Sequence, residues 1–259
     1  MKICILDICP ENITENHATV LNNGDHDYYF VTYKGQNEKA ISFNKGKSWG
    51  YNRNFLFEHV TGKYDYYIFI DYDIILEHKN GLNPIEYMVS VLEKYKPLLY
   101  RPAGFNTDLK LKEGFAIGGF INHSITVMHD SIAQAIFPLS TNYGGFWDTA
   151  SYLNTITIPI IENNVLVDYN IIAHNTQSSN YIQNIIPTIG KSAMQKIYAT
   201  TCKYYTTNVP AIKKIGDFRT YWQDRIKIGE PTQLSEIPTF DMNHYLDIEG
   251  LKKELKIIP

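Results

Sequence analysis

Apolar runs and segments of helical periodicity alternate over the first hundred residues of the chain. Apolar and aromatic runs at residues 2–8, 27–33 and 66–70 predict three strands, and the last is unbroken, as in a strand covered on both faces. Residues 11–23 and 45–61, between these strands, have the pattern of helices that stop at glycines. The order strand, helix, strand, helix, strand predicts a parallel, doubly wound sheet, which binds ligands at the carboxyl ends of its strands.

The pattern is less regular in the remainder of the chain. Residues 81–96 predict a helix, because apolar residues recur on one face and Pro97 follows. The next expected elements are a strand at 98–100, a loop or hairpin at 106–119, a strand at 121–129, short helices at 131–137 and 148–155, and a polar segment at 170–181. From residue 182 onward, isolated helical pieces alternate with proline-containing connectors. The pattern therefore predicts an α/β domain followed by a mainly helical or irregular extension over residues 182–259.

Composition excludes several classes of protein. Hydrophobic residues make up 44% and charged residues 20% of the 259 residues, which is ordinary for a globular protein with a sizeable core. The net charge of −3 and the absence of a Lys/Arg run argue against a nucleic-acid partner. No segment approaches eighteen uninterrupted apolar residues, so no membrane span is expected. The three cysteines form no CxxC pair, which indicates neither a disulfide framework nor a zinc site and favours a reducing, cytoplasmic compartment.

Two carboxylates stand at the end of the apolar run at 66–70. Asp71 and Asp73 are two positions apart, so they project to the same side of an extended chain and could face one cation, although a turn after Asp71 would change that geometry. Carboxylate oxygens suit Mg²⁺ or Mn²⁺, which usually keep several waters and also bind a substrate phosphate. The alternative is that the two acids only cap the strand and solvate a turn.

Three features occur together in the first half of the chain: a strand at its start, a helix containing Asn52-Arg53-Asn54, and a buried strand ending in Asp71-Tyr72-Asp73. Arg53 precedes Asp71 by eighteen residues. This combination resembles the nucleotide-sugar-binding half of GT-A-fold glycosyltransferases, in which an Arg-Asn pair often lies at that distance before a DxD motif. The resemblance covers residues 1–100 well, residues 100–180 loosely, and the last eighty residues not at all.

The resemblance implies a Rossmann-like, mixed and mostly parallel sheet flanked by helices. It also implies a catalytic domain at residues 1–181, with the nucleotide-sugar-binding half at 1–100 and the acceptor half at 101–181. The extension at 182–259 would then pack on the same domain. Whether the extension wraps that domain, closes over the acceptor or makes a homodimer contact is not decided by its residue spacing.

The same resemblance implies roles for individual residues. Asp7 and Ile8 would receive the base and ribose of the donor, and Asp71 and Asp73 would hold Mn²⁺ or Mg²⁺ against its diphosphate, unless Asp71 faces the ribose instead. His174 is expected as a further metal ligand, ahead of His123 and His129. The other expected donor contacts, each with core packing or an ordinary surface position as its alternative, are Tyr33, Lys47, Trp49, Arg53 and Tyr72.

An inverting enzyme also needs a carboxylate within hydrogen-bond reach of the acceptor hydroxyl. Asp148 is the expected base, because it follows an aromatic, glycine-containing loop at 144–147, although an aspartate there could simply cap a helix. Glu162 and Asp108 are the alternatives. Arg101 could contact the donor or the acceptor sugar.

The function implied is metal-dependent transfer of a hexose from a nucleoside diphosphate sugar, UDP-linked by expectation, to a hydroxyl of a carbohydrate acceptor. A second hypothesis is nucleotidyl transfer to a sugar phosphate. Enzymes of that class usually have a glycine-rich, basic loop after the first strand, and residues 9–12, Cys-Pro-Glu-Asn, lack one. A third hypothesis is a non-catalytic carbohydrate-binding protein of the same fold, which would bind glycan without releasing UDP.

Overall fold

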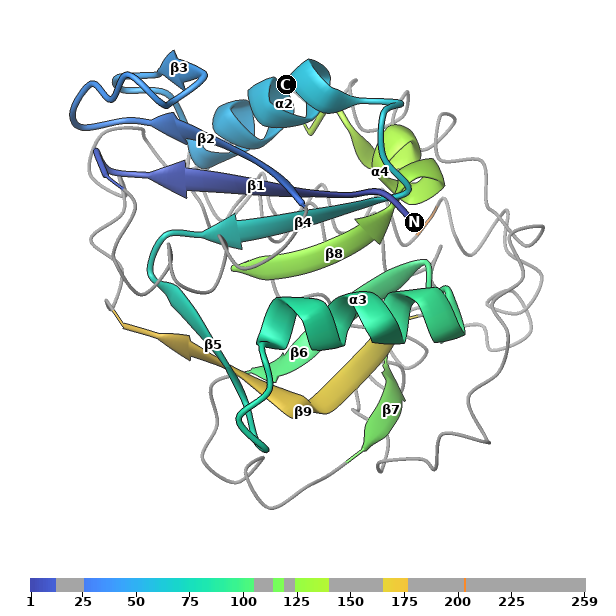
Figure 1. The fold of residues 1–259 in the computed structure, drawn as a ribbon. Helices are drawn as coiled ribbons and strands as arrows, with labels where there is room; N and C mark the ends of the chain where they lie inside the picture. The colour runs from blue at the N-terminus through green and yellow to red at the C-terminus, as the bar shows by residue number, and fades with distance from the viewer. Residues whose placement is uncertain (13–25, 105–113, 119–123, 140–164, 177–202, 204–259) are drawn as a thin grey trace.

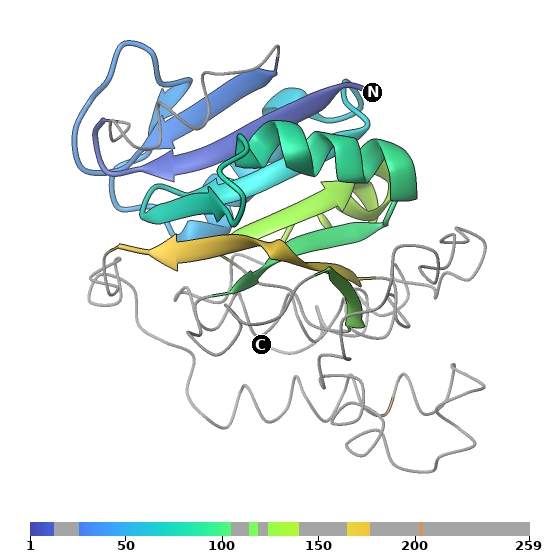
Figure 2. The same ribbon diagram turned by 60° about the horizontal axis from the view of Figure 1, so that its bottom comes forward.

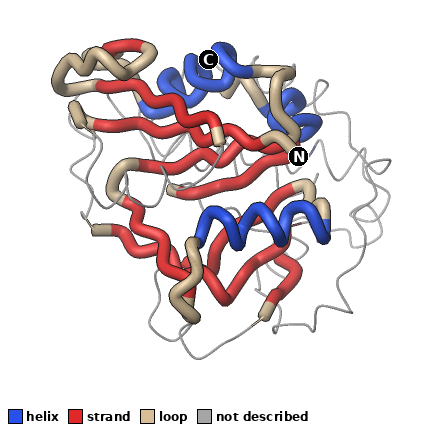
Figure 3. Tube along the Cα trace, viewed as in Figure 1, coloured by secondary structure: helices blue, strands red, loops and turns tan. Residues whose placement is uncertain are grey.

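A computed structural model of the chain describes residues 1–12, 26–104, 114–118, 124–139, 165–176 and 203 (Figure 1). Within these residues, nine strands form one sheet in the order β3-β2-β1-β4-β8-β6-β9-β5, and β7 pairs with β9 beside this path. The strands are β1 Ile3–Cys9, β2 Asp27–Thr32, β3 Ser42–Phe43, β4 Tyr66–Asp71, β5 Ile74–His78, β6 Leu99–Gly104, β7 Phe115–Gly118, β8 Ile125–His129 and β9 Val165–Asn175. The helices are α2 Trp49–Val60, α3 Pro84–Tyr95 and α4 Asp130–Ile136 (Figure 3).

The sheet is mixed. Strands β3, β2, β1 and β4 are parallel to one another, and β6 is parallel to β9. Strand β8 is antiparallel to both β4 and β6, and β5 and β7 are antiparallel to β9. Most strands therefore run in one direction, and the carboxyl ends of β1, β2 and β4 meet at one edge of the sheet.

Strand β4 is covered on both faces, as its apolar sequence predicts. Tyr67 and Phe69 face α2 and α4, where Phe57 of α2 contacts both rings and Phe137 stacks on Phe69 with ring centroids 5.0 Å apart. Tyr66, Ile68 and Ile70 alternate with them and belong to the core cluster that contains the apolar face of α3. The two helical layers lie on opposite sides of the sheet (Figures 1 and 2). Because both faces are buried, only the ends of β4 can present polar groups to a ligand.

Several predicted elements are confirmed and others needed correction. Five predicted strands correspond to observed ones: 2–8 to β1, 27–33 to β2, 66–70 to β4, 98–100 to β6 and 121–129 to β8. Three predicted helices do so as well: 45–61 is α2, 81–96 is α3 and 131–137 is α4. The prediction of a polar segment at 170–181 is wrong for residues 170–175, which form the second half of β9. The turn after Asp71 is followed by a separate strand, β5, which is the last strand in the order of the sheet. The sequence pattern did not predict this strand.

The helices expected at 11–23 and 148–155 and the whole extension at 182–259 fall largely or wholly outside the described residues. None of the described helices is long and apolar enough to cross a membrane.

A buried polar cluster explains why the β9 pattern is hard to recognise. Asp168 is fully buried within β9, where its carboxylate accepts hydrogen bonds from the Tyr100 hydroxyl at 2.7 Å and from the backbone N–H of Asn170 at 2.8 Å. The Asn170 amide donates a further bond to Asp168 and another to the Tyr87 hydroxyl, both at 2.9 Å. The polar residues that interrupt the apolar run are thus satisfied inside the sheet, where β6 shifts register against β9.

Burial gives Asp168 a measurable effect on stability. Desolvation raises the pKa of Asp168 from 3.8 to about 6, against the opposing effect of the hydrogen bonds from Tyr100 and Asn170. The folded protein therefore holds this proton at pH values where the unfolded chain has lost it. The contribution of Asp168 to the free energy of unfolding is expected to fall by about 3 kcal/mol as the pH rises from 4 to 6, and to stay constant above that.

The variant Asp168→Asn isolates this effect, because an amide can keep the bonds to Asn170 and Tyr100 without a charge. Urea unfolding between pH 4 and 8 should show the wild type losing stability relative to the variant as the pH rises from 4 to 6, with a constant difference above that. Parallel curves for the two proteins would contradict the prediction. The difference between the curves removes the contribution of every other titrating group, Asp71 included.

Candidate functional site

The carboxyl ends of β1, β2 and β4 bring several of the predicted donor contacts to one edge of the sheet. Ile8 of β1 lies opposite Val31 of β2 and Asp71 of β4 in the register, which places the residues that follow these strands side by side. Tyr33 follows β2 and Tyr72 follows β4, and their ring centroids are 6.4 Å apart. The structure therefore gathers Ile8, Tyr33, Asp71 and Tyr72 around one edge.

Asp71 is held in place by two side chains of α2. The Arg53 guanidinium donates to Asp71 Oδ1 at 2.5 Å, and the indole Nε1 of Trp49 donates to the same oxygen at 3.0 Å. Arg53 is 1% exposed and the Asp71 side chain 14% exposed, so this ion pair is largely removed from water. With Oδ1 occupied twice, Oδ2 is the Asp71 oxygen left to face a ligand.

The position of Arg53 follows from the helix that carries it. The Ser48 side chain caps α2 by accepting a hydrogen bond from the backbone N–H of Tyr51, which fixes the start of the helix. Trp49 and Arg53 are four residues apart, so they lie on one face, and the guanidinium carbon stands 4.9 Å from the Trp49 ring centroid. A second bond from Arg53, to the carbonyl of Leu6 at 3.3 Å, ties the helix to β1. The guanidinium is therefore preorganised toward the end of β4.

The electrostatics of Asp71 favour a cation. Burial raises the pKa of Asp71 from 3.8 to about 7, while Arg53 and Trp49 oppose this shift and the charges of Asp73 and Asp7 add to it. Burial prevails, because one ion pair and one hydrogen bond do not replace the lost solvation of the carboxylate. A divalent cation beside Asp71 and Asp73 would relieve the repulsion between the two acids.

Backbone hydrogen bonds fix the turn between β4 and β5 on both sides. The N–H of Asp71 donates to the carbonyl of Ser124 at 2.9 Å. The N–H and the hydroxyl of Thr176 both donate to the carbonyl of Asp73, at 2.8 and 3.1 Å. The turn, which Figure 3 shows as the short tan link between two strands, is thus anchored by Thr176, the residue that follows β9 beside β5.

His174 lies near this turn in the register of the sheet but has another partner. It stands opposite Ile75 in the β5–β9 ladder, and its Nε2 is 2.9 Å from Glu77 Oε2. Among the described residues, no group of three or more His, Cys, Asp or Glu side chains is arranged to hold a metal ion. The role of His174 as a third ligand therefore stays a prediction.

Asp7 has polar partners that sequence reasoning missed. Its side chain is fully buried, and Oδ2 accepts hydrogen bonds from the Tyr28 hydroxyl at 2.8 Å and from Cys9 Sγ at 3.2 Å. Tyr28 lies close to Asp7 because it belongs to β2, the strand that pairs with β1. Asp7 alternates with Leu6 and Ile8, so its side chain lies on the face of the sheet opposite α2.

None of the contacts described for the remaining expected residues involves Asp71 or Asp73. Lys47 is exposed, with its ammonium 4.9 Å from the Tyr51 ring centroid. Arg101 is buried in β6 and donates to the carbonyl of Pro102 at 3.4 Å. His129 caps α4 at the opposite end of the strands. The predicted base Asp148 and the alternatives Glu162, Asp108 and His123 lie outside the described residues.

No protein family model matches the sequence, and no curated protein matches it. Among solved structures, the chain is similar to GalNAc-T7, crystallised with UDP, GalNAc and Mn²⁺, with a TM-score of 0.52 and 7% identity over 86% of this chain and 55% of that one. The fold is of the GT-A type. The chain spans about half the length of that glycosyltransferase.

Two further solved structures give lower scores. The mannosyltransferase PcManGT from Pyrobaculum calidifontis, in complex with GDP-Man and Mn²⁺, has a TM-score of 0.45 and 9% identity over 76% of this chain and 62% of that one. A197 from STIV has a TM-score of 0.46 and 9% identity over 69% of this chain and 87% of that one. In this fold, the Arg53–Asp71 ion pair joins the first half of α2 to the carboxyl end of β4.

Proposed function

We propose that the protein is a metal-dependent glycosyltransferase that transfers a hexose from a nucleoside diphosphate sugar, UDP-linked by preference, to a hydroxyl of a carbohydrate acceptor. The observation that carries the proposal is the Arg53–Asp71 pair at the carboxyl end of β4, followed at once by Asp73 in an anchored turn. The GT-A fold supports it, and so does a structural neighbour crystallised with UDP, GalNAc and Mn²⁺.

The residues at this edge fit a divalent cation. Asp71 Oδ2 and the Asp73 carboxylate are hard oxygen donors, and Mg²⁺ or Mn²⁺ commonly takes only one or two protein carboxylates, with water and phosphate oxygens as its other ligands. When bound, such a cation acts as a Lewis acid that neutralises the charge developing on the diphosphate leaving group. We infer that Arg53 and Trp49 orient Asp71, and that His174 joins the ligands only if it leaves Glu77.

The remaining roles follow from this arrangement. Tyr33 and Tyr72 flank the edge where the nucleoside would lie, and Asp7 and Ile8 lie near the carboxyl end of β1 beside it. Asp148, from the half at residues 101–181, is the proposed base that takes the proton of the acceptor hydroxyl if the anomeric centre inverts. Residues 1–100 would bind the donor, and the extension at 182–259 would pack on the same domain.

Calorimetric titration of UDP with and without Mn²⁺ tests the proposal directly. We expect UDP to bind measurably only when Mn²⁺ is present, and a panel of UDP- and GDP-sugars to identify a donor through release of the nucleoside diphosphate. Metal-independent binding of UDP would contradict the proposal. Release of pyrophosphate from a nucleoside triphosphate and a sugar phosphate would indicate nucleotidyl transfer instead.

A further inference from the structure

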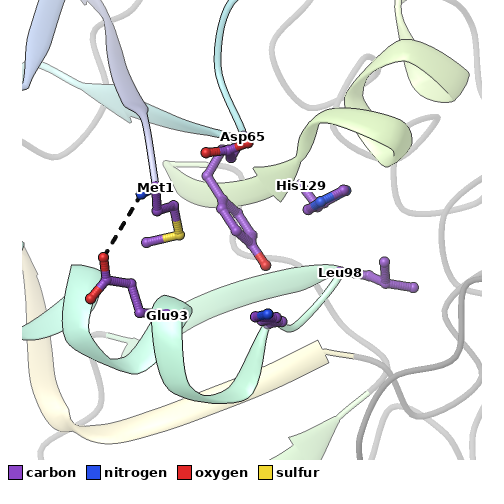
Figure 4. A pocket seen from close by; sticks show the side chains of 7 residues that line it. Met1, Asp65, Glu93, Leu98 and His129 are labelled. Atoms are coloured by element: carbon purple, nitrogen blue, oxygen red, sulfur yellow. Dashed lines mark ion pairs between the residues drawn. The ribbon is translucent and has the colours of Figure 1, made fainter.

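A hollow lies at the opposite end of β4 from the two acids. It has a volume of about 560 Å³ and opens where β1 and β4 begin, where β8 ends and where α3 ends (Figure 4). Strand β4 runs from this hollow to Asp71, and six residues of strand separate the two edges by roughly 17 Å. The volume is within the range of about 300 to 1,000 Å³ that is usual for small-molecule sites.

Hydrogen-bond acceptors line one part of the hollow. Asp65 is exposed, and its Oδ2 accepts a hydrogen bond from the backbone N–H of Lys2 at 2.6 Å, which holds the carboxylate at the rim. The Glu93 side chain, on the last turns of α3, is 58% exposed and stands 4.0 Å from the Met1 amino group. Figure 4 shows these two carboxylates on different sides of the hollow.

Hydrogen-bond donors line the rest. His129 Nδ1 accepts a hydrogen bond from the backbone N–H of Ser131 and lies 2.8 Å from the Ser131 hydroxyl. In the tautomer in which that hydroxyl also donates to Nδ1, the ring proton of the neutral histidine is on Nε2, which can then donate to a ligand. Burial lowers the pKa of His129 and so favours this neutral form, although Asp130 and Asp65 oppose the shift. Lys96 is exposed and brings an ammonium group from the C-cap of α3.

The floor of the hollow is apolar. Tyr66 and Leu98 are each 2% exposed, and the Tyr66 hydroxyl is already used, since it donates to the carbonyl of Pro97 at 2.9 Å. The His129 ring packs edge-on against the Tyr66 ring with centroids 5.1 Å apart, which fixes the histidine at the wall. The hollow thus has an apolar base surrounded by separate donors and acceptors.

We propose that this hollow binds a neutral, polyhydroxylated ligand, namely a sugar residue or short glycan. A hydroxyl group can donate to Asp65 or Glu93 and accept from His129 or Lys96, whereas a ligand of either net charge would meet a like-charged side chain on one wall. The C–H face of a sugar ring would cover the apolar floor. This site goes beyond the proposed transfer reaction, because it lies at the edge that the donor site does not use.

Two substitutions withdraw these donors from the hollow and keep the backbone roles of the residues. His129→Asn retains an oxygen that can cap α4, and its shorter side chain ends nearer the backbone than His129 Nε2 does. Lys96→Gly removes the ammonium group and suits a left-handed backbone with φ of 47°. Glu86→Gln changes an exposed carboxylate in the first turn of α3, away from the hollow, and serves as the matched control. Probes are maltose, cellobiose, lactose and chitobiose, with spermidine and glucose 6-phosphate as charged comparisons.

Binding is followed by amide chemical shifts in heteronuclear NMR. We expect at least one neutral disaccharide to shift resonances of Asp65, Leu98 and His129 in a saturable way, at least tenfold more weakly in His129→Asn and Lys96→Gly, and equally in Glu86→Gln. Tighter binding of spermidine or glucose 6-phosphate at these residues, or no saturable shift with any disaccharide, would overturn the proposal. Asp73→Ala should leave these shifts unchanged, so failure of the donor site and failure of this site give different results.

Discussion

Replacing Arg53 by methionine is expected to lower the free energy of unfolding by about 3 to 5 kcal/mol at pH 8, the usual loss when one partner of a buried ion pair is removed. Methionine keeps much of the packing on Trp49 and Phe69 but removes the guanidinium that opposes the rise in the pKa of Asp71, so this carboxyl group must either stay charged without its partner or take up a proton. Trp49→Phe removes only one hydrogen bond from the same carboxylate, so its loss should be smaller, about 1 to 3 kcal/mol. Urea unfolding of both variants measures these losses.

The double variant Arg53→Met/Asp71→Asn separates charge from packing. If the loss of stability in Arg53→Met comes from an Asp71 carboxyl group without its partner, replacing that group by an amide should recover most of the lost stability. A double variant as unstable as Arg53→Met would show instead that the guanidinium stabilises the protein through its contacts with the Trp49 and Phe69 rings. The two outcomes differ by more than the usual error of such extrapolations.

The second large effect concerns ligand binding and not folding. Asp73→Ala is expected to weaken Mn²⁺-dependent UDP binding by about 100-fold or more, because it removes one of two carboxylates proposed to hold the cation. The hydrogen bonds from the backbone N–H and the hydroxyl of Thr176 to the Asp73 carbonyl do not involve the Asp73 side chain, so the turn should keep its conformation. Calorimetry with UDP and Mn²⁺ measures the affinity, and the unfolding midpoint reports on the fold.

Glu86→Ala is the matched control for Asp73→Ala, since it removes an exposed carboxylate from α3. It should bind UDP and Mn²⁺ as the wild type does. Unchanged affinity in Asp73→Ala, with an unchanged unfolding midpoint, would mean that Asp73 is not a metal ligand. Loss of affinity accompanied by a fall in the midpoint of many degrees would instead indicate a structural role for this side chain.

Local pattern was sufficient for the elements that bury one continuous apolar run or one helical face. Strands β1 and β4 and helix α3 are of this kind, and each was predicted close to its observed bounds. Strand β9 was not predicted, because Asp168 and Asn170 have the pattern of polar loop residues in the sequence. Their hydrogen bonds to Tyr100 and Tyr87, which allow them to be buried, are seen only in the structure. Strand β5 was missed because two residues separate it from β4 in sequence, while the strands β8, β6 and β9 separate it from β4 in the sheet.

The candidate site was accessible to sequence reasoning only in part. The eighteen-residue separation of Arg53 and Asp71 singled out both residues, and the structure joins them in an ion pair. The bond from Trp49 to the same oxygen depends on how α2 sits over the sheet, which no spacing reveals. The bond between His174 and Glu77 joins residues 97 positions apart and reflects the antiparallel register of two strands whose pairing was not predicted.

The anchoring of Asp73 by Thr176 has a consequence for the growing polypeptide. The two residues are 103 positions apart, so the turn that carries the acids leaves the ribosome long before the strand that fixes it. At about 5 to 20 residues per second, this delay is roughly 5 to 20 s. During that interval β1, β2, β4 and α2 can already pair, but the acidic turn has no anchor from β9. Competence to bind a cation is therefore expected to be a late event of synthesis, and a nascent chain released before residue 176 should lack it.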